Sequence, residues 1–262
     1  MSCFETSMKI SEGQNVLIFY QNGKTWLTRV SNAHKLHTHI GVIDFKEIIG
    51  LEFGSKYITN KDKTVFLLEP TTYDLIIKSE RKTQIVYPKD LGFIAARTGL
   101  KNGCKVIEIG TGSAALTTFF ASIVKPDGHI FTFDVNEEFM KIARKNLEKA
   151  CLQEFVTMHL HNSYHGLEVV DADIAVIDLG DPWNVLEIVY KSLKPSGSVV
   201  AICPTVNQIE KTAIQMRRGG FTDIEAIEIF TRNIEAREGM TRPSMRMIGH
   251  TTYLIFARKI LE

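Results

Sequence analysis

VIEIGTGSAAL, residues 106–116, joins an apolar stretch of strand character to a glycine-rich turn and then to a segment with helical spacing. Gly110 and Gly112 permit a tight turn and allow a ligand to come close to the backbone. The helix that follows begins with N–H groups that have no partner within the helix and can donate to a ligand. This strand–loop–helix unit predicts a binding site for a nucleotide-like cofactor.

Strands and helices alternate around this unit. Alternation at this spacing predicts a parallel sheet covered by helices on both faces. The last two expected strands have no complete helix between them and predict a closing antiparallel hairpin. The expected strands are 105–109, 129–134, 155–160, 173–178, 197–203, 222–230 and 251–259, and the expected helices begin near residues 88, 113, 136, 182 and 206.

In the first part of the chain, short stretches of β character replace the alternation of strands and helices. Residues 16–30, VLIFYQNGKTWLTRV, place Asn22-Gly23 between two β-rich stretches, which is a strong hairpin signal. Further short β-type runs follow, separated by glycines. We therefore predict a small β domain over residues 1–68 and a larger α/β domain over residues 69–262.

Composition narrows the class of protein. The 262 residues include 31 Lys and Arg against 30 Asp and Glu, which excludes a uniformly basic coat but allows a local basic patch. No apolar run reaches the roughly 20 residues that span a bilayer, and the N-terminus lacks a signal-peptide pattern. Cys3, Cys104, Cys151 and Cys203 are scattered without a CxxC pair. These features predict a cytoplasmic protein.

Two acidic residues near the glycine motif bear on which ligand it binds. Asp134, at the end of the next strand, can bind the hydroxyls of a ribose, and the motif also satisfies the dinucleotide fingerprint, so NAD is a competing ligand. Glu108, expected at the mouth of the site, would repel a pyrophosphate. It would suit a ligand that carries an amino group and a sulfonium charge, namely S-adenosylmethionine (SAM). A tight turn without a ligand is the third interpretation.

A second group of polar residues follows another buried strand in DIAVIDLGDPW, residues 173–183. Asp178 stands at the carboxyl end of that strand, where open α/β sheets bind ligands. Asp181 is a candidate N-cap before Pro182 at the first position of a helix. Trp183 either stacks on a base or packs against the protein.

Four segments together resemble a known family. They are QIVYPKD (84–90), EIGTGS (108–113), DLGDPW (178–183) and RPSMRMIGHT (242–251). With them the chain resembles the tRNA (adenine-N1)-methyltransferases that modify the T-loop adenine at position 58, with position 57 as a further candidate. The resemblance is to the single-chain homotetrameric type of bacteria and archaea, and it covers essentially the whole chain.

The resemblance implies a seven-stranded, Rossmann-like SAM-methyltransferase sheet with a small N-terminal β domain. It implies that Asp178 is the catalytic residue, that Asp134 binds the ribose, and that Asn162 and Ser163 lie near the adenine of SAM. The implied cofactor-binding residues are Tyr87, Pro88, Glu108, Gly110, Thr111, Gly112, Ser113, Asp134, Asn162, Ser163 and Asp178. The chain departs from the family at Ala114, where glycine is usual, and at Asn162, where an acid is often found.

Methylation of adenine N1 suggests a specific role for Asp178. Alkylation of N1 makes the adenine ring cationic, and a carboxylate bonded to the 6-amino group would stabilise that charge as it develops. Because N1 lies on the Watson–Crick edge, the base must be unpaired or flipped into a pocket. The competing interpretations are a protein-isoaspartyl O-methyltransferase, a non-catalytic tRNA-binding subunit and an NAD-dependent oxidoreductase.

The enzyme would also need contacts to RNA. The candidates are Lys78, Arg81, Lys82, Lys89, Trp183, Arg237, Arg242 and Arg246. We expect a structural role for His250. We expect no metal site at His34, His37 and His39, because only His37 and His39 would share a strand face and no Cys or acid stands at ligand spacing.

Overall fold

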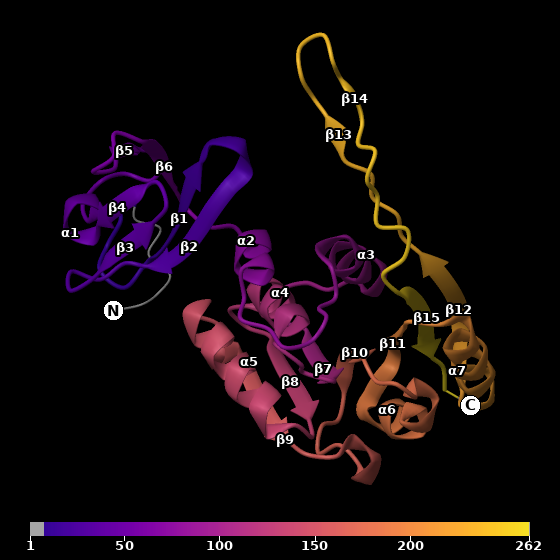
Figure 1. Ribbon diagram of the computed structural model, residues 1–262. Coiled ribbons are helices and arrows are strands. Elements are labelled where there is room, and N and C mark those ends of the chain that lie inside the picture. The colour runs from indigo at the N-terminus through magenta and orange to yellow at the C-terminus, as the bar shows by residue number, and fades with distance from the viewer. Residues whose placement is uncertain (1–7, 262) are drawn as a thin grey trace. The chain divides into compact units, whose positions relative to one another are not determined.

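The structure is a computed structural model that describes residues 8–261. The chain forms two compact units, residues 8–79 with 148–151 and residues 80–147 with 152–261 (Figure 1). Cys3 lies outside the described residues. The boundary placed between residues 68 and 69 from the sequence stays a prediction.

The first unit is built on a four-stranded antiparallel sheet with the order β2-β1-β6-β5. A three-residue turn, Gln21–Gly23, joins the first two strands and confirms the predicted hairpin. Val16, Ile18, Val65 and Leu67 are fully buried between the sheet and the short elements that cover it. The elements are β1 (Asn15–Tyr20), β2 (Lys24–Arg29), β3 (Lys35–Thr38), β4 (Gly41–Asp44), α1 (Phe45–Ile48), β5 (Lys56–Ile58), β6 (Thr64–Leu68) and α2 (Thr72–Ile77).

The second unit contains a seven-stranded sheet with the order β12-β15-β11-β10-β7-β8-β9. Pairing is parallel from β11 to β9, and β15 is antiparallel to both of its neighbours. The predicted parallel sheet and closing antiparallel hairpin are therefore confirmed. The strands are β7 (Lys105–Ile109), β8 (His129–Asp134), β9 (Val156–Leu160), β10 (Ala172–Ile177), β11 (Leu193–Cys203), β12 (Phe221–Glu228) and β15 (Tyr253–Lys259).

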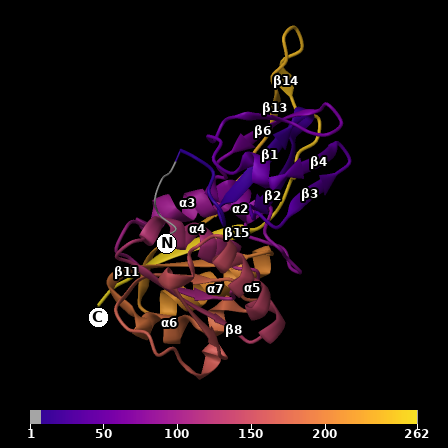
Figure 2. The same ribbon diagram turned by 90° about the vertical axis from the view of Figure 1, so that its left-hand side faces the viewer.

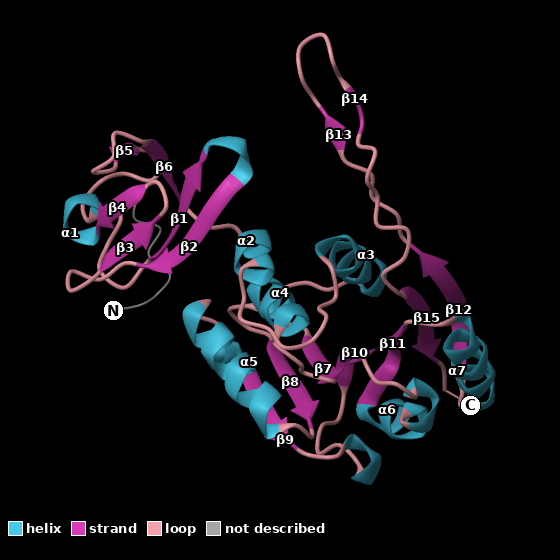
Figure 3. Cartoon of the chain, in the orientation of Figure 1, coloured by secondary structure: helices cyan, strands magenta, loops and turns pink. Residues whose placement is uncertain are grey.

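Helices cover both faces of this sheet (Figure 3). On one face, Phe93 packs edge-on against Phe256 with ring centroids 5.8 Å apart. On the other face, Val189 and Met216 are fully buried in one cluster with the strands. The first face carries α3 (Pro88–Thr98), α4 (Ala115–Val124) and α5 (Glu137–Lys149), and the second carries α6 (Leu186–Ser192) and α7 (Val206–Arg218).

The topology fixes where a ligand can bind. From β7 the chain proceeds to β8 and β9 on one side and then returns to β10 on the other, so the strand order reverses between β7 and β10. Open α/β sheets bind ligands beyond the carboxyl ends of the strands at such a point. The glycine loop (residues 110–113) follows β7, Asp134 is the last residue of β8, and Asp178 follows β10.

A long segment, residues 229–252, separates β12 from β15. It contains a two-stranded ribbon of β13 (Ile234–Glu235) and β14 (Arg242–Pro243), which extends from the sheet of the second unit in both views (Figures 1 and 2). The return of this ribbon carries the RPSMRMIGHT segment. Among the described residues, no helix is both long and apolar enough to cross a membrane.

Candidate functional site

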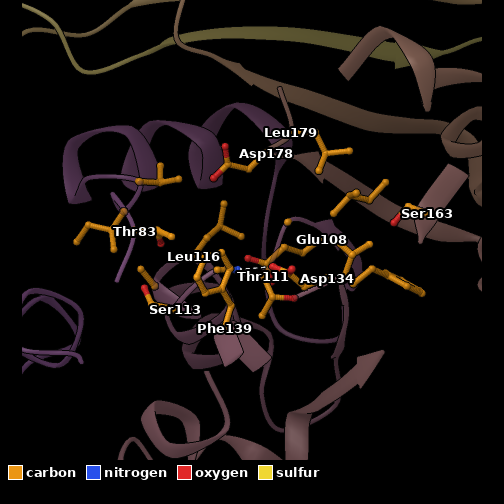
Figure 4. Close-up of a pocket in the computed structure, with 18 of the residues that line it drawn as sticks. Thr83, Glu108, Thr111, Ser113, Leu116, Asp134, Phe139, Ser163, Asp178 and Leu179 are labelled. Carbon is orange, nitrogen blue, oxygen red and sulfur yellow. Dashed lines mark hydrogen bonds between the residues drawn. The ribbon is translucent and has the colours of Figure 1, made fainter. Parts of the chain in front are cut away.

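A cavity of about 390 Å³, which we call the main cavity, opens at the carboxyl ends of β7, β8 and β10 (Figure 4). One side is formed by a segment without helix or strand, residues 80–87, which we call the arm. The opposite wall is the glycine loop. The lining includes residues 83–86, 108–113, 133–135, 161–164, 178 and 179.

Gly110 has to be glycine for two reasons. Its φ is +99°, a conformation that L side chains rarely adopt. A Cβ there would also lie 2.3 Å from the backbone oxygen of Asp178. The glycine therefore allows the loop after β7 to lie directly against the end of β10, which brings Asp178 to the cavity.

Asp134 holds the other side of the glycine loop. Its Oδ2 accepts a hydrogen bond of 3.0 Å from the backbone N–H of Gly112, and its Oδ1 accepts one of 2.8 Å from Asn136. The side chain also lines the main cavity. Asp134 thus shapes the loop and also faces the main cavity, and its role in binding a ribose stays a prediction.

Glu108 is not at the mouth of the site, and that expectation was wrong. It lies inside β7, only 1% exposed, and forms part of the cavity wall. Its Oε2 accepts a hydrogen bond of 2.6 Å from Oγ1 of Thr117. Burial raises the pKa of Glu108 to about 8, so the carboxyl is largely protonated at neutral pH and its charge would not repel a pyrophosphate. A cation bound beside it would lower that pKa again.

Asp178 follows β10 directly and is open to the cavity. Its backbone N–H donates to the oxygen of Ile109, 2.8 Å away, but no described residue donates a hydrogen bond to its carboxylate. The protein around the carboxylate and the charge of Asp134 raise the pKa of Asp178 to about 6. The group is therefore mostly ionised at neutral pH and available to a ligand.

A second cavity of about 350 Å³ lies on the other side of Asp178. It shares Asp178 and arm residues 84–86 with the main cavity, and its remaining lining includes Tyr87, Asp90 and residues 248 and 250–252 of the segment before β15. Two ligands could therefore approach the same carboxylate from two directions.

The wall of the second cavity is held by buried polar contacts. Asp90 is fully buried and accepts hydrogen bonds from Nζ of Lys89, at 2.7 and 2.9 Å. The same ammonium donates to Oγ1 of Thr251, 2.8 Å away. Lys89, expected from the sequence to contact phosphate, is thus engaged within the protein.

His250 has the structural role expected for it. Its Nδ1 lies 2.6 Å from Oε1 of Glu228, and its Nε2 lies 2.9 Å from the backbone oxygen of Pro204. The hydrogen bond to Glu228 raises the pKa of His250. The ring thereby ties the segment before β15 to the ends of β11 and β12.

The expected cofactor residues divide between the two cavities. Ser113 is 5% exposed and lines the main cavity, and its Oγ has no partner among the described residues. Asn162 and Ser163 line the same cavity, where Oδ1 of Asn162 accepts a hydrogen bond of 3.1 Å from the N–H of Tyr164. Tyr87 lines the second cavity instead, and Pro88, which begins α3, lines neither.

Ala114 stands where the resemblance leads us to expect glycine, and it affects the conformation of the backbone. Ala114 is fully buried, lies outside the lining of the main cavity and has φ +63°. That left-handed conformation costs an alanine about 1 kcal/mol, and a glycine would adopt it without this cost. The methyl group of Ala114 does not form part of the wall of the main cavity.

Asp181 occupies the N-cap position before Pro182, as predicted, but its side chain makes no capping hydrogen bond. Its Oδ2 accepts a hydrogen bond of 2.7 Å from the amide of Asn184, and its Oδ1 accepts one from the hydroxyl of Tyr164. Burial and the bond to Asp181 raise the pKa of Tyr164 to about 12. Tyr164 lines the main cavity, and its sequence context gave no signal of that.

Trp183 lies outside the linings of both cavities. Its ring faces Nζ of Lys211 from α7, 4.8 Å from the ring centroid. Pro182 does begin a short 3₁₀ helix, as predicted. A role of Trp183 in stacking on a base stays a prediction.

The expected RNA contacts lie in several places. Lys78, in the first unit, donates to the oxygen of Thr25 at 3.0 Å, Lys82 pairs with Glu138, and Arg81 is exposed. On the ribbon, Arg237 and Arg246 are exposed, and Arg242 lies 3.4 Å from Glu235.

The histidines of the first unit form no metal-binding group with their neighbours. The ring of His39 packs against Trp26, with centroids 5.7 Å apart. Over residues 8–261 the structure contains no group of three or more His, Cys, Asp or Glu side chains that could hold a metal ion.

Comparisons with known proteins identify the family of the chain. The sequence profile of the family described as "tRNA methyltransferase complex GCD14 subunit" matches residues 63–241. The tRNA (adenine(57)-N(1)/adenine(58)-N(1))-methyltransferase TrmI of Methanocaldococcus jannaschii is 36% identical over 92% of this chain and 94% of its own length.

Two solved structures are similar over almost the whole chain. A protein described as a SAM-dependent O-methyltransferase from Thermotoga maritima is 34% identical, with a TM-score of 0.91 over 97% of this chain and 96% of the other. The tRNA methyltransferase TrmI of Aquifex aeolicus is 33% identical, with a TM-score of 0.83 over 97% and 100%. On the profile match and these identities, the chain belongs to the GCD14 family of tRNA methyltransferases.

Proposed function

We propose that this protein transfers the methyl group of SAM to N1 of the T-loop adenine of tRNA at position 58. The observation that carries the proposal is the junction of two cavities at Asp178, whose carboxylate has no protein partner among the described residues. In a chain of this family, one cavity would hold the methyl donor and the other the acceptor base.

The main cavity has the features that a SAM site needs. Its volume of about 390 Å³ is within the range of small-ligand sites, roughly 300–1,000 Å³. The unpartnered Oγ of Ser113 can bond the carboxylate of the methionine part, Glu108 can pair with its amino group, and Asp134 can accept from the ribose hydroxyls. SAM supplies a methyl group bonded to a positively charged sulfur.

The acceptor base would enter the second cavity after leaving its tertiary pair. In the reaction, the lone pair of N1 would form the new bond to the methyl carbon, the electrons of the broken C–S bond would remain on sulfur, and the positive charge would move to the adenine ring. Asp178 accepts a hydrogen bond from the 6-amino group and stabilises that charge. Holding the two reactants in line is the other contribution of the protein.

Basic residues outside the cavities would bind the tRNA backbone. We infer that the phosphates contact Lys78, Arg81, Lys82, Arg237, Arg242 and Arg246, with Trp183 as a candidate stacking residue. The cytoplasmic location expected from the sequence stays a prediction.

A homotetramer is also part of the proposal. The ribbon exposes large apolar side chains, including Met245 at 82% and Ile234 at 57%. Contiguous exposed apolar residues commonly mark interaction surfaces. Light scattering is expected to give about four times the 29.6 kDa chain mass. Met245→Glu combined with Ile234→Glu should lower this mass while SAM binding persists.

The proposed reaction is tested with labelled SAM and three unmodified tRNA transcripts. These carry adenine at both 57 and 58, adenine at 58 alone, or guanine at both positions. Label in the first two and none in the third supports the proposal, and their stoichiometries separate one target from two. One structural relative is described as an O-methyltransferase, so the assay is repeated with a protein as the methyl acceptor. If the protein gains base-labile label and the tRNA gains none, the result would favour methylation of carboxylates instead.

A further inference from the structure

The arm is the wall that both cavities share, yet it has no secondary structure to hold it in place. Residues 83–86 line the main cavity, and residues 84–87 line the second cavity. No helix or strand includes residues 80–87. A segment of this kind is expected to open locally unless other groups bind its backbone. Something must therefore fix its position relative to the glycine loop.

The contacts of Asn146 supply that attachment. Its Nδ2 donates hydrogen bonds to the backbone oxygens of Glu80, at 2.8 Å, and Ser113, at 2.9 Å. Its Oδ1 accepts a hydrogen bond of 3.1 Å from the backbone N–H of Glu80. One side chain thus binds both backbone polar groups at the start of the arm and the last carbonyl of the glycine loop.

The arm and the glycine loop also approach each other directly. A Cβ placed on Gly112 would lie 3.5 Å from Oγ1 of Thr83, the first arm residue of the main cavity. A small displacement of the arm would therefore change the space beside the loop. It would also move residues 84–86, which line both cavities together with Asp178.

The position of Asn146 is otherwise unfavourable for its residue type. It is 7% exposed on the buried face of α5, beside Ala143 and Leu147. Asparagine is a weak helix former, and a buried amide without partners would be strongly destabilising. Here both N–H groups and the oxygen are used. Aspartate would place an oxygen against two carbonyls, and leucine would make none of the three bonds.

We propose that Asn146 is a positioning residue that fixes the arm to the glycine loop and so sets the geometry of both cavities. The inference rests on the proposed function, because it takes the two cavities to be the sites of SAM and the acceptor base. Asn146 lies outside the linings of both cavities and would act through the backbone of Glu80 and Ser113.

The test compares Asn146→Asp with Lys145→Ala, an exposed position on the same helix. SAM affinity is measured by calorimetry, methylation by labelled SAM and tRNA, and mobility by hydrogen exchange. For Asn146→Asp we expect SAM binding weakened about tenfold or more, from the loss of two donated hydrogen bonds. Peptides covering residues 80–87 should exchange faster, while those covering β7 and β10 keep their protection. Lys145→Ala should match the unaltered protein in all three.

A purely structural role predicts a different result. Asn146→Asp would then lower the melting temperature and accelerate exchange throughout the second unit, with SAM affinity within twofold of normal, and the inference would be overturned. If Asn146→Asp does not fold, Asn146→Leu removes the same bonds without burying a charge and is judged by the same criteria.

The unaltered protein separates the two possible failures. If it binds no SAM and labels no tRNA, the proposed function fails and with it the premise of the inference. If it binds SAM and methylates tRNA while both Asn146 variants bind SAM normally, only the role of Asn146 is wrong.

Discussion

Asp178 combines an accessible carboxylate with a pKa raised to about 6 by the surrounding protein and by Asp134. Only the ionised form carries the negative charge that stabilises the positive charge developing on the adenine ring. As pH falls through 6 the carboxylate gains a proton, so turnover should fall. We predict a pH–rate profile with an acidic limb of apparent pKa about 6.

Asp178→Asn checks that assignment. The variant should keep SAM affinity and lose about 100-fold in turnover at pH 8, as is typical when one electrostatic contact to the transition state is removed. The acidic limb should disappear with it. If the variant keeps near-normal turnover and turnover still falls below pH 6, a group other than Asp178 is responsible for the pH dependence.

Glu108 provides a prediction about the cofactor. Its pKa of about 8 belongs to a carboxyl buried beside Thr117, and pairing with an amino cation would lower that value. Binding of SAM at pH 7 should therefore release a proton from Glu108, and SAM affinity should increase from pH 6 to pH 8. Calorimetry in buffers of different ionisation enthalpy measures the proton count. The released proton should be missing in Glu108→Gln, and equal counts in both proteins would contradict the pairing.

At the scale of elements, the glycine loop depends on its approach to the end of β10. Gly110→Ala would place a methyl group 2.3 Å from the oxygen of Asp178 at a positive φ, and either the loop or β10 must move. We predict loss of detectable SAM binding in calorimetry. Ala114→Gly is the matched control, because it removes a left-handed alanine from the same turn, and it should bind SAM normally.

The elements themselves were largely predictable. Alternating apolar strands and amphipathic helices predicted the parallel sheet with its closing antiparallel hairpin correctly, and the Asn22-Gly23 turn predicted the first hairpin. The seven-stranded sheet was implied by the family resemblance. The ribbon between β12 and β15 was not predicted, because its strands are two residues long and carry no periodicity. Such pairing depends on tertiary context rather than on local preference.

The site was predictable only in part. The glycine loop, Asp134 and Asp178 have local signatures, and the structure brings them together around one cavity. The burial of Glu108 and the bonds of Asp181 to Tyr164 and Asn184 depend on neighbours distant in sequence. Asn146 did leave a signal, since it is an amide on the apolar stripe of α5, and a buried amide requires partners.

For the whole molecule, the near balance of charge makes tRNA binding depend on where the cations lie. With 31 basic and 30 acidic residues, the chain has no general attraction for RNA. We predict that Arg237→Glu on the ribbon weakens tRNA binding and reduces the slope of log Kd against log salt by about 1. Arg217→Glu, at the end of α7, changes the net charge equally and should leave the slope unchanged. Equal losses in the two variants would indicate that total charge, not the ribbon, governs binding.

The place of β15 in the sheet has a consequence for biosynthesis. This strand lies between β12 and β11 although it comes last of the three along the chain. While a ribosome is still translating residues 229–252, β12 has been made but has no partner through which to join the growing sheet. The nascent polypeptide therefore exposes one edge of β11 until residues 253–259 emerge from the exit tunnel, and a chaperone that shields bare strand edges would be needed most in that interval.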